Sequence, residues 1–357
     1  MSSSNQESSV AGAIDYPARN EQPVPVQPRQ PRNLQGLLRF AMEATKAEDA
    51  PGPSNLGPMD EERRRFLEEA LKTMTVDVAE MLQNAIKVLS DETVLNSIQE
   101  DDDLPEEVNS MLNVIIQFVD DIDVANDFSK LGGFSIFPVC FSCKHLDVRA
   151  RASVILGTMC QNNPECQART LNYFLLSVLI NLANEEIDKN SQGTLLGKYL
   201  YGISGIVRGY EPAMTEILEQ DGCQMLMNVL NSANSPAKAR AAFVIQHLCH
   251  NEAIKEYFVN QKIVLVIANH LTSENASEIQ TTENYLALLQ TLVEGFPPAL
   301  MQQCRDPEVD IKSILENHLA LAEQDEMLTE EAEYCKTILN QIEQSLNYDD
   351  LNDEVDR

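Results

Sequence analysis

The chain has 357 residues, and its 56 acidic side chains outnumber its 26 Lys and Arg side chains, so its formal net charge is −30. A field of that sign repels phosphate backbones and anionic lipids, which argues against nucleic acid and membranes as partners. The apolar runs are shorter than the roughly 18 residues of a membrane helix, and the N-terminus has no pattern of a secretory signal. We therefore expect a cytoplasmic protein, with the nucleus as the alternative compartment.

Apolar residues recur at spacings of three and four through most of the chain, and strand-like alternation is hard to find. That period is typical of amphipathic helices, so the sequence predicts an all-α fold. The eight cysteines are scattered and mostly surrounded by apolar residues. In a reducing compartment they are expected to be free thiols that pack as small hydrophobic side chains.

Residues 1–58 contain eight of the 16 prolines, together with many Ser, Gln, Asn and Glu. Such a segment buries too little apolar surface to offset its ordering entropy, which predicts disorder. Residues 33–44 are an exception, because Leu34, Leu37, Leu38 and Met42 lie on one side of a short helix that begins near Asn33. This helix is either transient within a linker or a recognition segment that folds on binding.

Residues 59–98 are predicted to form two capping helices. Asp60 and Asp77 can each cap the start of one, and apolar residues follow both at helical spacing. A polar break over residues 99–107 includes the acidic triplet Asp101–Asp103, which we interpret as a solvated loop rather than as a metal site.

A repeat runs through residues 108–346. The segments Ala150–Asn162 and Ala239–Asn251 match without a gap at an offset of 89 residues. The steps from Arg151 to Lys198, to Arg240 and to Asn284 are 47, 42 and 44 residues. Periods of about 40–47 residues are typical of armadillo and HEAT solenoids.

Each repeat reads as a short helix, a second helix and a longer third helix. In one repeat these are predicted at 211–218, 222–230 and 236–250, with Gly222 and Pro236 at the turns. Three helices per repeat favour the armadillo type, a right-handed superhelical solenoid whose neighbouring units bury their apolar faces jointly. We expect residues 326–346 to cap the far end and residues 347–357 to form a short acidic tail.

Catalytic motifs are missing. Cys140 and Cys143, followed by His145, lack the further ligands that a zinc site needs, and a helix rather than a strand is expected before them. The other histidines are dispersed, and the chain has no phosphate-binding glycine loop. The sequence therefore predicts a protein that is not an enzyme and has no metal or cofactor.

A binding surface is a better candidate for the functional site than a catalytic or metal centre. One side of the third helices combines cations with polar and aromatic residues, although the chain as a whole is acidic. The predicted partner-binding residues on this face are Arg149, Arg151, Lys198, Tyr201, Arg208, Lys238, Arg240, Phe243, His247, Asn251, Asn284 and Glu294. They are either ordinary solvated helix positions or, as we favour, a positive strip that meets an acidic protein surface.

Four segments carry a family resemblance: Pro31–Leu38, Glu61–Arg64, Ala125–Phe128 with Gly132 and Gly133, and Gln303–Glu308. They resemble the armadillo-type nucleotide exchange factors of the 70-kDa heat-shock chaperone, from about residue 31 to the C-terminus. The chain lacks the retention tail of the secretory-pathway relatives and is similar to the cytosolic branch.

The resemblance implies a monomeric co-chaperone that binds the chaperone's ATPase domain through the concave face and promotes release of ADP and client. In that family the flexible N-terminal segment is associated with client release. The resemblance assigns this role here to the segment that contains Asn33, Leu34, Leu37 and Leu38.

A peptide-binding armadillo adaptor is the alternative function. Such grooves use repeated Trp and Asn residues, whereas this chain has no Trp. The positions of the Asn ladder hold Thr158, Gly205, His247 and Thr291. These differences count against the adaptor.

Overall fold

The computed structural model describes residues 77–187, 189, 194–232, 235–272, 279–295 and 297–355. The predicted segment 1–58, with Asn33, Leu34, Leu37 and Leu38, lies outside these residues, as does the first predicted capping helix. All regular structure in the described residues is helical, which confirms the all-α prediction. The described helices belong to one compact unit, Val78–Arg357.

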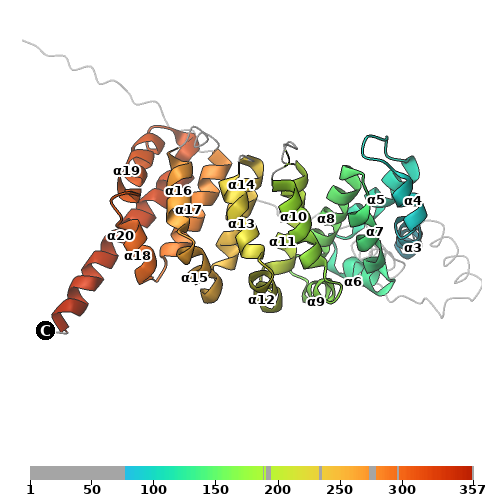
Figure 1. The fold of residues 1–357 in the computed structure, drawn as a ribbon, viewed down its shortest axis with the longest axis horizontal. Helices are drawn as coiled ribbons and strands as arrows, with labels where there is room; N and C mark the ends of the chain where they lie inside the picture. Colours follow the sequence, from blue (N-terminus) through green and yellow to red (C-terminus); the bar gives the residue numbers. More distant parts are fainter. Residues whose placement is uncertain are drawn as a thin grey trace, which may run out of the picture. The chain divides into compact units, whose positions relative to one another are not determined.

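Three-helix repeats build this unit (Figure 1). The first helices are α6 (Ile122–Lys130), α9 (Pro164–Asn172), α12 (Glu211–Glu219), α15 (Glu252–Asn260) and α18 (Pro298–Cys304). The second helices are α7 (Ile136–Ser142, after the 3-10 turn η1, Gly133–Ser135), α10 (Leu175–Ile187), α13 (Gly222–Asn231), α16 (Ile263–Leu271) and α19 (Ile311–Ala322). The third helices are α8 (Leu146–Cys160), α11 (Thr194–Val207), α14 (Ser235–Leu248), α17 (Ile279–Val293) and α20 (Thr329–Val355, after the 3-10 turn η3, Glu326–Leu328).

The third helices pack side by side in chain order, α8 on α11, α11 on α14, α14 on α17 and α17 on α20. Three helices precede the first repeat, α3 (Val78–Leu89), α4 (Glu92–Ser97) and α5 (Glu106–Phe118), and α5 packs on α8. The core stripe expected on α14 is buried, at Ala241, Val244, Ile245, Leu248 and Cys249. All eight cysteines are buried free thiols.

The turn between the first and second helices has one backbone conformation in every repeat. A single residue with positive φ redirects the chain in each: Gly132 (91°), Phe174 (55°), Asp221 (56°), Lys262 (57°) and Asp310 (45°). Gly222, which was expected to make this turn, follows the residue with positive φ, Asp221, and is needed for a different reason. A Cβ on Gly222 would overlap Ile217 of the preceding helix, so glycine is needed there for close packing.

The sequence match between Ala150–Asn162 and Ala239–Asn251 is shifted by one residue relative to the structure at its C-terminal end. It pairs Asn162 with Asn251, but the residue that caps α9 is Asn163, whose side chain accepts from the backbone N–H of Cys166. Asn251 caps α15 in the same way, through the N–H of Ile254. The two turns have the same length, and the extra residue belongs to α8, which has 15 residues where α14 has 14. Asn162, in the turn before α9, takes a left-handed φ of 53°.

Helices α8 and α11 approach each other at backbone contact. A Cβ on Gly205 would overlap the carbonyl oxygen of Gly157, and a Cβ on Gly202 would lie 3.2 Å from the carbonyl oxygen of Ser153. Gly197, on the same helix, would have no atom within 4 Å of an added Cβ. Glycine is therefore required at some positions of α11 but not at others.

We expect Gly205→Ala to lower the free energy of unfolding by about 1–3 kcal/mol, because the added methyl forces the two backbones apart. Gly197→Ala is the matched control and should raise it by about 0.5–1 kcal/mol, since alanine loses less backbone entropy in a helix. Urea unfolding of both variants measures the difference. Equal effects of the two substitutions would contradict this packing.

The last helix is longer than expected. We predicted a separate acidic tail from residue 347, but the backbone of α20 stays helical as far as Val355. The physical reason lies in the sequence, which has neither Gly nor Pro between Thr329 and Arg357 to end a helix.

A buried carboxyl group lies at the start of α20. The side chain of Glu331 is 3% exposed, and burial, followed by the nearby charge of Glu283 on α17, raises its pKa to about 7. His318 Nδ1 is 3.9 Å from Glu331 Oε2, while its Nε2 lies 2.8 Å from the carbonyl oxygen of Leu271. The packing of α17, α19 and α20 thus includes a carboxyl that resists ionisation.

This carboxyl makes stability depend on pH. Above a pH of about 4.5 the unfolded chain ionises Glu331, whereas the folded chain holds the proton up to about pH 7. The free energy of unfolding should therefore fall as pH rises through this window. Glu331→Gln should remove that part of the fall and be more stable than the parent at pH 8 by about 2 kcal/mol.

Chemical denaturation at pH 4.5, 6 and 8 tests this prediction. Glu333→Gln is the control, because Glu333 is exposed on the same helix. If the Glu331→Gln curve stays parallel to that of the parent, the Glu331 carboxyl does not control the pH dependence.

Candidate functional site

The candidate face is formed by side chains at three- and four-residue spacing on α8, α11 and α14. Contacts between the helices confirm that these positions are neighbours. The hydroxyl groups of Thr158 on α8 and Tyr201 on α11 lie 3.1 Å apart. Arg240 on α14 lies over the Tyr201 ring, with its Cζ 5.6 Å from the ring centre.

Five of the predicted residues form what we call the central cluster, namely Tyr201, Arg208, Arg240, Phe243 and His247. The Cζ atoms of Arg208 and Arg240 are each 5.9 Å from the centre of the Phe243 ring. The rings of Phe243 and His247 are 4.3 Å apart. Cation–π contacts and ring packing therefore hold two guanidinium groups around the Phe243 ring.

Hydrogen bonds fix the orientation of this cluster. The Tyr201 hydroxyl accepts from Gln161 Nε2 at 2.7 Å, and His247 Nδ1 lies 2.9 Å from the carbonyl oxygen of Phe243. Burial, followed by the charges of Arg208 and His250, holds the pKa of His247 below its ordinary value. The positive charge of the cluster at neutral pH therefore comes from the two arginines.

Arg151 has a different role from Arg240, although the repeat makes the two equivalent. Its guanidinium pairs with Asp147 at 2.7 Å and donates to Asn109 at 2.7 Å and Asn113 at 3.1 Å. Its side chain is only 26% exposed. Arg151 thus joins α8 to α5, and the i, i+4 spacing of Asn109 and Asn113 is the sequence signal that could have revealed this.

The predicted positive strip is not continuous. Arg149 and Lys238 each lie two residues from a cation of the candidate face, which on a helix is a rotation of about 200°. Arg149 instead lies beside Tyr199, where it opposes the effect of burial, which raises the pKa of that phenol to about 12. Lys198 is exposed on the same side of α11 as Tyr201.

The remaining predicted residues are separate from the central cluster. Asn251 caps α15 and donates to Glu211 at 2.6 Å, so it connects two first helices. Asn284 is half-buried on α17, and Glu294 is exposed just beyond the end of that helix. The backbone carbonyl of Glu294 accepts from Lys255 Nζ at 2.8 Å.

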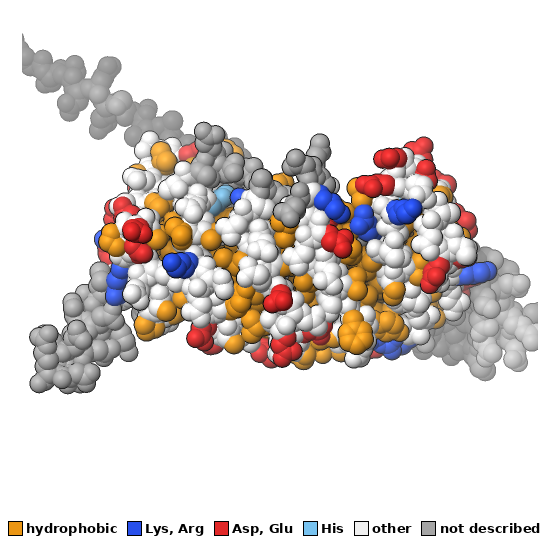
Figure 2. Space-filling view, in the orientation of Figure 1, with side chains coloured by type: hydrophobic (Ala, Val, Ile, Leu, Met, Phe, Trp, Pro, Cys, Tyr) orange, Lys and Arg blue, Asp and Glu red, His pale blue; other side chains and the backbone are white. Residues whose placement is uncertain are grey.

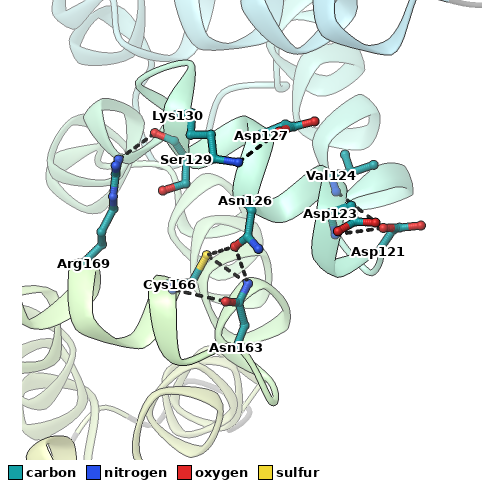
Figure 3. Close-up of polar contacts among 10 residues, drawn as sticks. All are labelled: Asp121, Asp123, Val124, Asn126, Asp127, Ser129, Lys130, Asn163, Cys166 and Arg169. Atoms are coloured by element: carbon teal, nitrogen blue, oxygen red, sulfur yellow. Dashed lines mark hydrogen bonds and ion pairs between the residues drawn. The ribbon is translucent and has the colours of Figure 1, made fainter. Parts of the chain in front are cut away.

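The segment 125–128, which carries part of the resemblance, is structural. Figure 3 shows Asn126 on α6 directed toward Asn163 and Cys166 at the start of α9; Asn163 Nδ2 donates to Asn126 Oδ1 at 2.9 Å. In the same interface, Arg169 donates to the carbonyl oxygen of Ser129 at 2.9 Å. These contacts join the first repeat to the second.

The segment 303–308 is also structural. Gln303 Nε2 donates to the carbonyl oxygen of Val259 at 2.6 Å, which links α18 to α15. Arg305 donates to Ser345 Oγ at 3.0 Å, which links it to α20. Both segments thus contribute side chains that hold neighbouring repeats together.

Surface charge is unevenly distributed. Figure 2 shows acidic side chains gathered along the edge where α12 and α15 lie. The exposed carboxylates of these two helices are Glu211, Glu219, Glu252 and Glu256. Among the described residues, no helix is long and apolar enough to cross a membrane, and no group of three His, Cys, Asp or Glu residues is placed to hold a metal ion.

Arg151 and Arg240 should differ in what they contribute to stability. Arg151→Ala removes an ion pair and two hydrogen bonds and should lower the free energy of unfolding by about 1–3 kcal/mol. Arg240→Ala loses only partly exposed cation–π contacts and should lower it by about 0.5–1 kcal/mol. Thermal and urea unfolding of the two variants measure this, and a larger loss for Arg240→Ala would contradict these assignments.

Two family models match the sequence. The SIL1/FES1/HPBP1 C-terminal domain matches residues 124–294, and the nucleotide exchange factor Fes1 model matches residues 34–128. The mouse protein named Hsp70-binding protein 1 is 30% identical over 323 residues, which are 87% of this chain and 86% of that protein. The human protein of the same name is 29% identical over 324 residues, 87% of this chain and 85% of its own.

Solved structures support the fold. A computationally designed armadillo repeat protein for modular peptide recognition superposes with a TM-score of 0.56 at 17% identity, covering 74% of this chain and 99% of its own. Another designed armadillo repeat protein, in complex with the peptide (KR)4, gives a TM-score of 0.57 at 14% identity and covers 74% of this chain and 100% of its own. The predicted armadillo organisation is therefore confirmed.

Proposed function

Because the chain belongs to the SIL1/FES1/HPBP1 family of nucleotide exchange factors, we propose that it binds the ATPase domain of the 70-kDa heat-shock chaperone and promotes release of ADP and client. The observation that carries this proposal is the 30% identity to Hsp70-binding protein 1 over 87% of the chain. The protein acts as a co-chaperone, as a monomer in the cytoplasm, and has no catalytic site of its own.

The central cluster is the proposed centre of the chaperone contact, with Lys198 beside it. In the described part of the chain neither Arg208 nor Arg240 has a carboxylate within ion-pair distance, although the protein is strongly acidic. Guanidinium groups bind carboxylates through paired hydrogen bonds, and Arg and Tyr are common at the energetic centres of protein interfaces. An acidic surface on the chaperone is therefore the complementary partner.

Linkage explains how binding releases nucleotide. If this protein weakens the chaperone's hold on ADP by some factor, ADP weakens the complex by the same factor. A coupling of about 1–3 kcal/mol changes each affinity about 5–150-fold. The segment with Asn33, Leu34, Leu37 and Leu38 is proposed to promote client release, and it lies outside the described residues.

Charge reversal in the central cluster tests the proposal. Arg208→Glu with Arg240→Glu should reduce affinity for the isolated ATPase domain about 100-fold, because repulsion is added to the lost attraction. Neutral Ala variants should lose less, and binding by the parent should weaken with added salt. Calorimetry and stopped-flow release of a fluorescent ADP measure both effects.

Lys130→Glu with Lys262→Glu is the matched control, since both lysines are exposed at the turns between first and second helices and the change in net charge is the same. This control should bind and release ADP like the parent. Full activity of the Arg208→Glu, Arg240→Glu variant would remove the central cluster from the contact.

A further inference from the structure

Phe174 is an outlier among the turns that join first and second helices. The equivalent turn residues in the other described repeats are Gly132, Asp221, Lys262 and Asp310, and all have positive φ. Phe174 takes the same conformation, with φ of 55°. A bulky residue is rarely found there, because its Cβ crowds the backbone, and such strain persists only where something else requires it.

The fold itself does not require an aromatic side chain at this position. Phe174 is 69% exposed, so its ring adds little to the core. The backbone of Phe174 stabilises the turn, because its N–H donates to the carbonyl oxygen of Leu171 at 2.9 Å and its carbonyl oxygen accepts from the N–H of Val178 at 3.1 Å. Any residue that tolerates a positive φ would make these bonds.

A second aromatic ring lies next to Phe174 in the chain. Tyr173 is 48% exposed, and its ring packs against buried Phe134 with centres 5.4 Å apart. One aromatic ring is thus anchored to the core while the next projects into solvent. Exposed aromatic side chains on a rigid base are typical of the energetic centre of an interface.

Carboxylates border this aromatic pair. One turn after Phe174, Ser177 hydrogen-bonds to Gln220, whose amide donates to Glu216 at 3.2 Å. Glu219 and Asp221 flank Gln220 and are exposed. Burial, followed by the charge of Glu219, raises the pKa of Glu216, so the negative charge of this edge is assigned to the exposed carboxylates of Glu219 and Asp221.

Two cations, Lys130 and Arg169, lie on the other side of the aromatic pair, and each has a partner within the protein. Lys130 pairs with Asp127 at 3.4 Å, and Arg169 donates to the carbonyl oxygen of Ser129 (Figure 3). Asp127 offsets the charge of Lys130, whereas Arg169 keeps its positive charge because a backbone carbonyl is neutral. The two exposed carboxylates of Glu219 and Asp221 outnumber this one cation, so the surroundings of Tyr173 and Phe174 carry a net negative charge.

We propose that Tyr173 and Phe174, with Glu219 and Asp221, form a docking surface for a basic polypeptide segment. An apolar side chain of that segment packs on Phe174, and its Lys or Arg side chains meet the carboxylates. The surface lies at the turns between first and second helices, so it does not depend on the chaperone contact of the third helices. Charge complementarity selects this partner over an acidic or neutral one.

Fluorescence anisotropy with the full-length protein tests the proposal. The probe is a short labelled peptide of leucines and lysines, compared with one in which glutamate replaces lysine and one in which serine replaces leucine. Only the leucine–lysine peptide should bind. Phe174→Asn should weaken its binding about tenfold without lowering the melting temperature, since asparagine tolerates a positive φ. Glu219→Gln with Asp221→Asn should also weaken it.

Leu265→Asn is the control, because it removes another exposed apolar side chain, 40% exposed, from a distant repeat. It should leave binding unchanged. Equal binding of the parent and Phe174→Asn, equal binding of the glutamate peptide, or failure of the leucine–lysine peptide to bind would each overturn the proposal. So would sedimentation that shows self-association of the parent and not of Phe174→Asn, since the occupant would then be a second copy of this chain.

Discussion

Joint burial between neighbouring repeats is the constraint on which the structure depends. A helix such as α14 has one apolar stripe, and burial of that stripe needs α11 on one side and α17 on the other. Each repeat is therefore stable only as part of the row, and the third helices must lie side by side in chain order. That order brings residues about one repeat apart in sequence, such as Tyr201 and Arg240, into contact.

The sequence predicted the elements better than it predicted the surface. The helical period, the repeat of about 44 residues and the buried stripe of α14 follow from which positions are apolar, and local patterns carry that information. The side-chain partners do not follow, because they depend on which atoms of neighbouring helices meet. Arg151 and Arg240 occupy equivalent positions, yet Arg151 is used by Asp147, Asn109 and Asn113, whereas Arg240 remains beside two rings.

Two other differences have simple physical causes. The six predicted cations were assigned to one face because they lie near equivalent positions of the repeats. A shift of two residues along a helix rotates a side chain by about 200°, so Arg149 and Lys238 lie on a different side from the other four. The backbone of the first-to-second helix turn is common to all the described repeats, and its residue is not. Because the residues at this position differ between repeats, the sequence does not reveal that they share a positive φ. The unusual conformation of Phe174 therefore becomes apparent only in the structure.

The glycine contact between α8 and α11 also has a mechanical consequence. Side chains between two helices act as soft spacers that can change rotamer, whereas Gly157 and Gly205 bring two backbones together with nothing compliant between them. This joint resists bending, and Tyr201 and Arg208 extend from α11 on either side of it. A protein that shifts the conformation of its partner must itself deform less than the partner does, and this glycine joint would hold Tyr201 and Arg208 of the central cluster in place under that load.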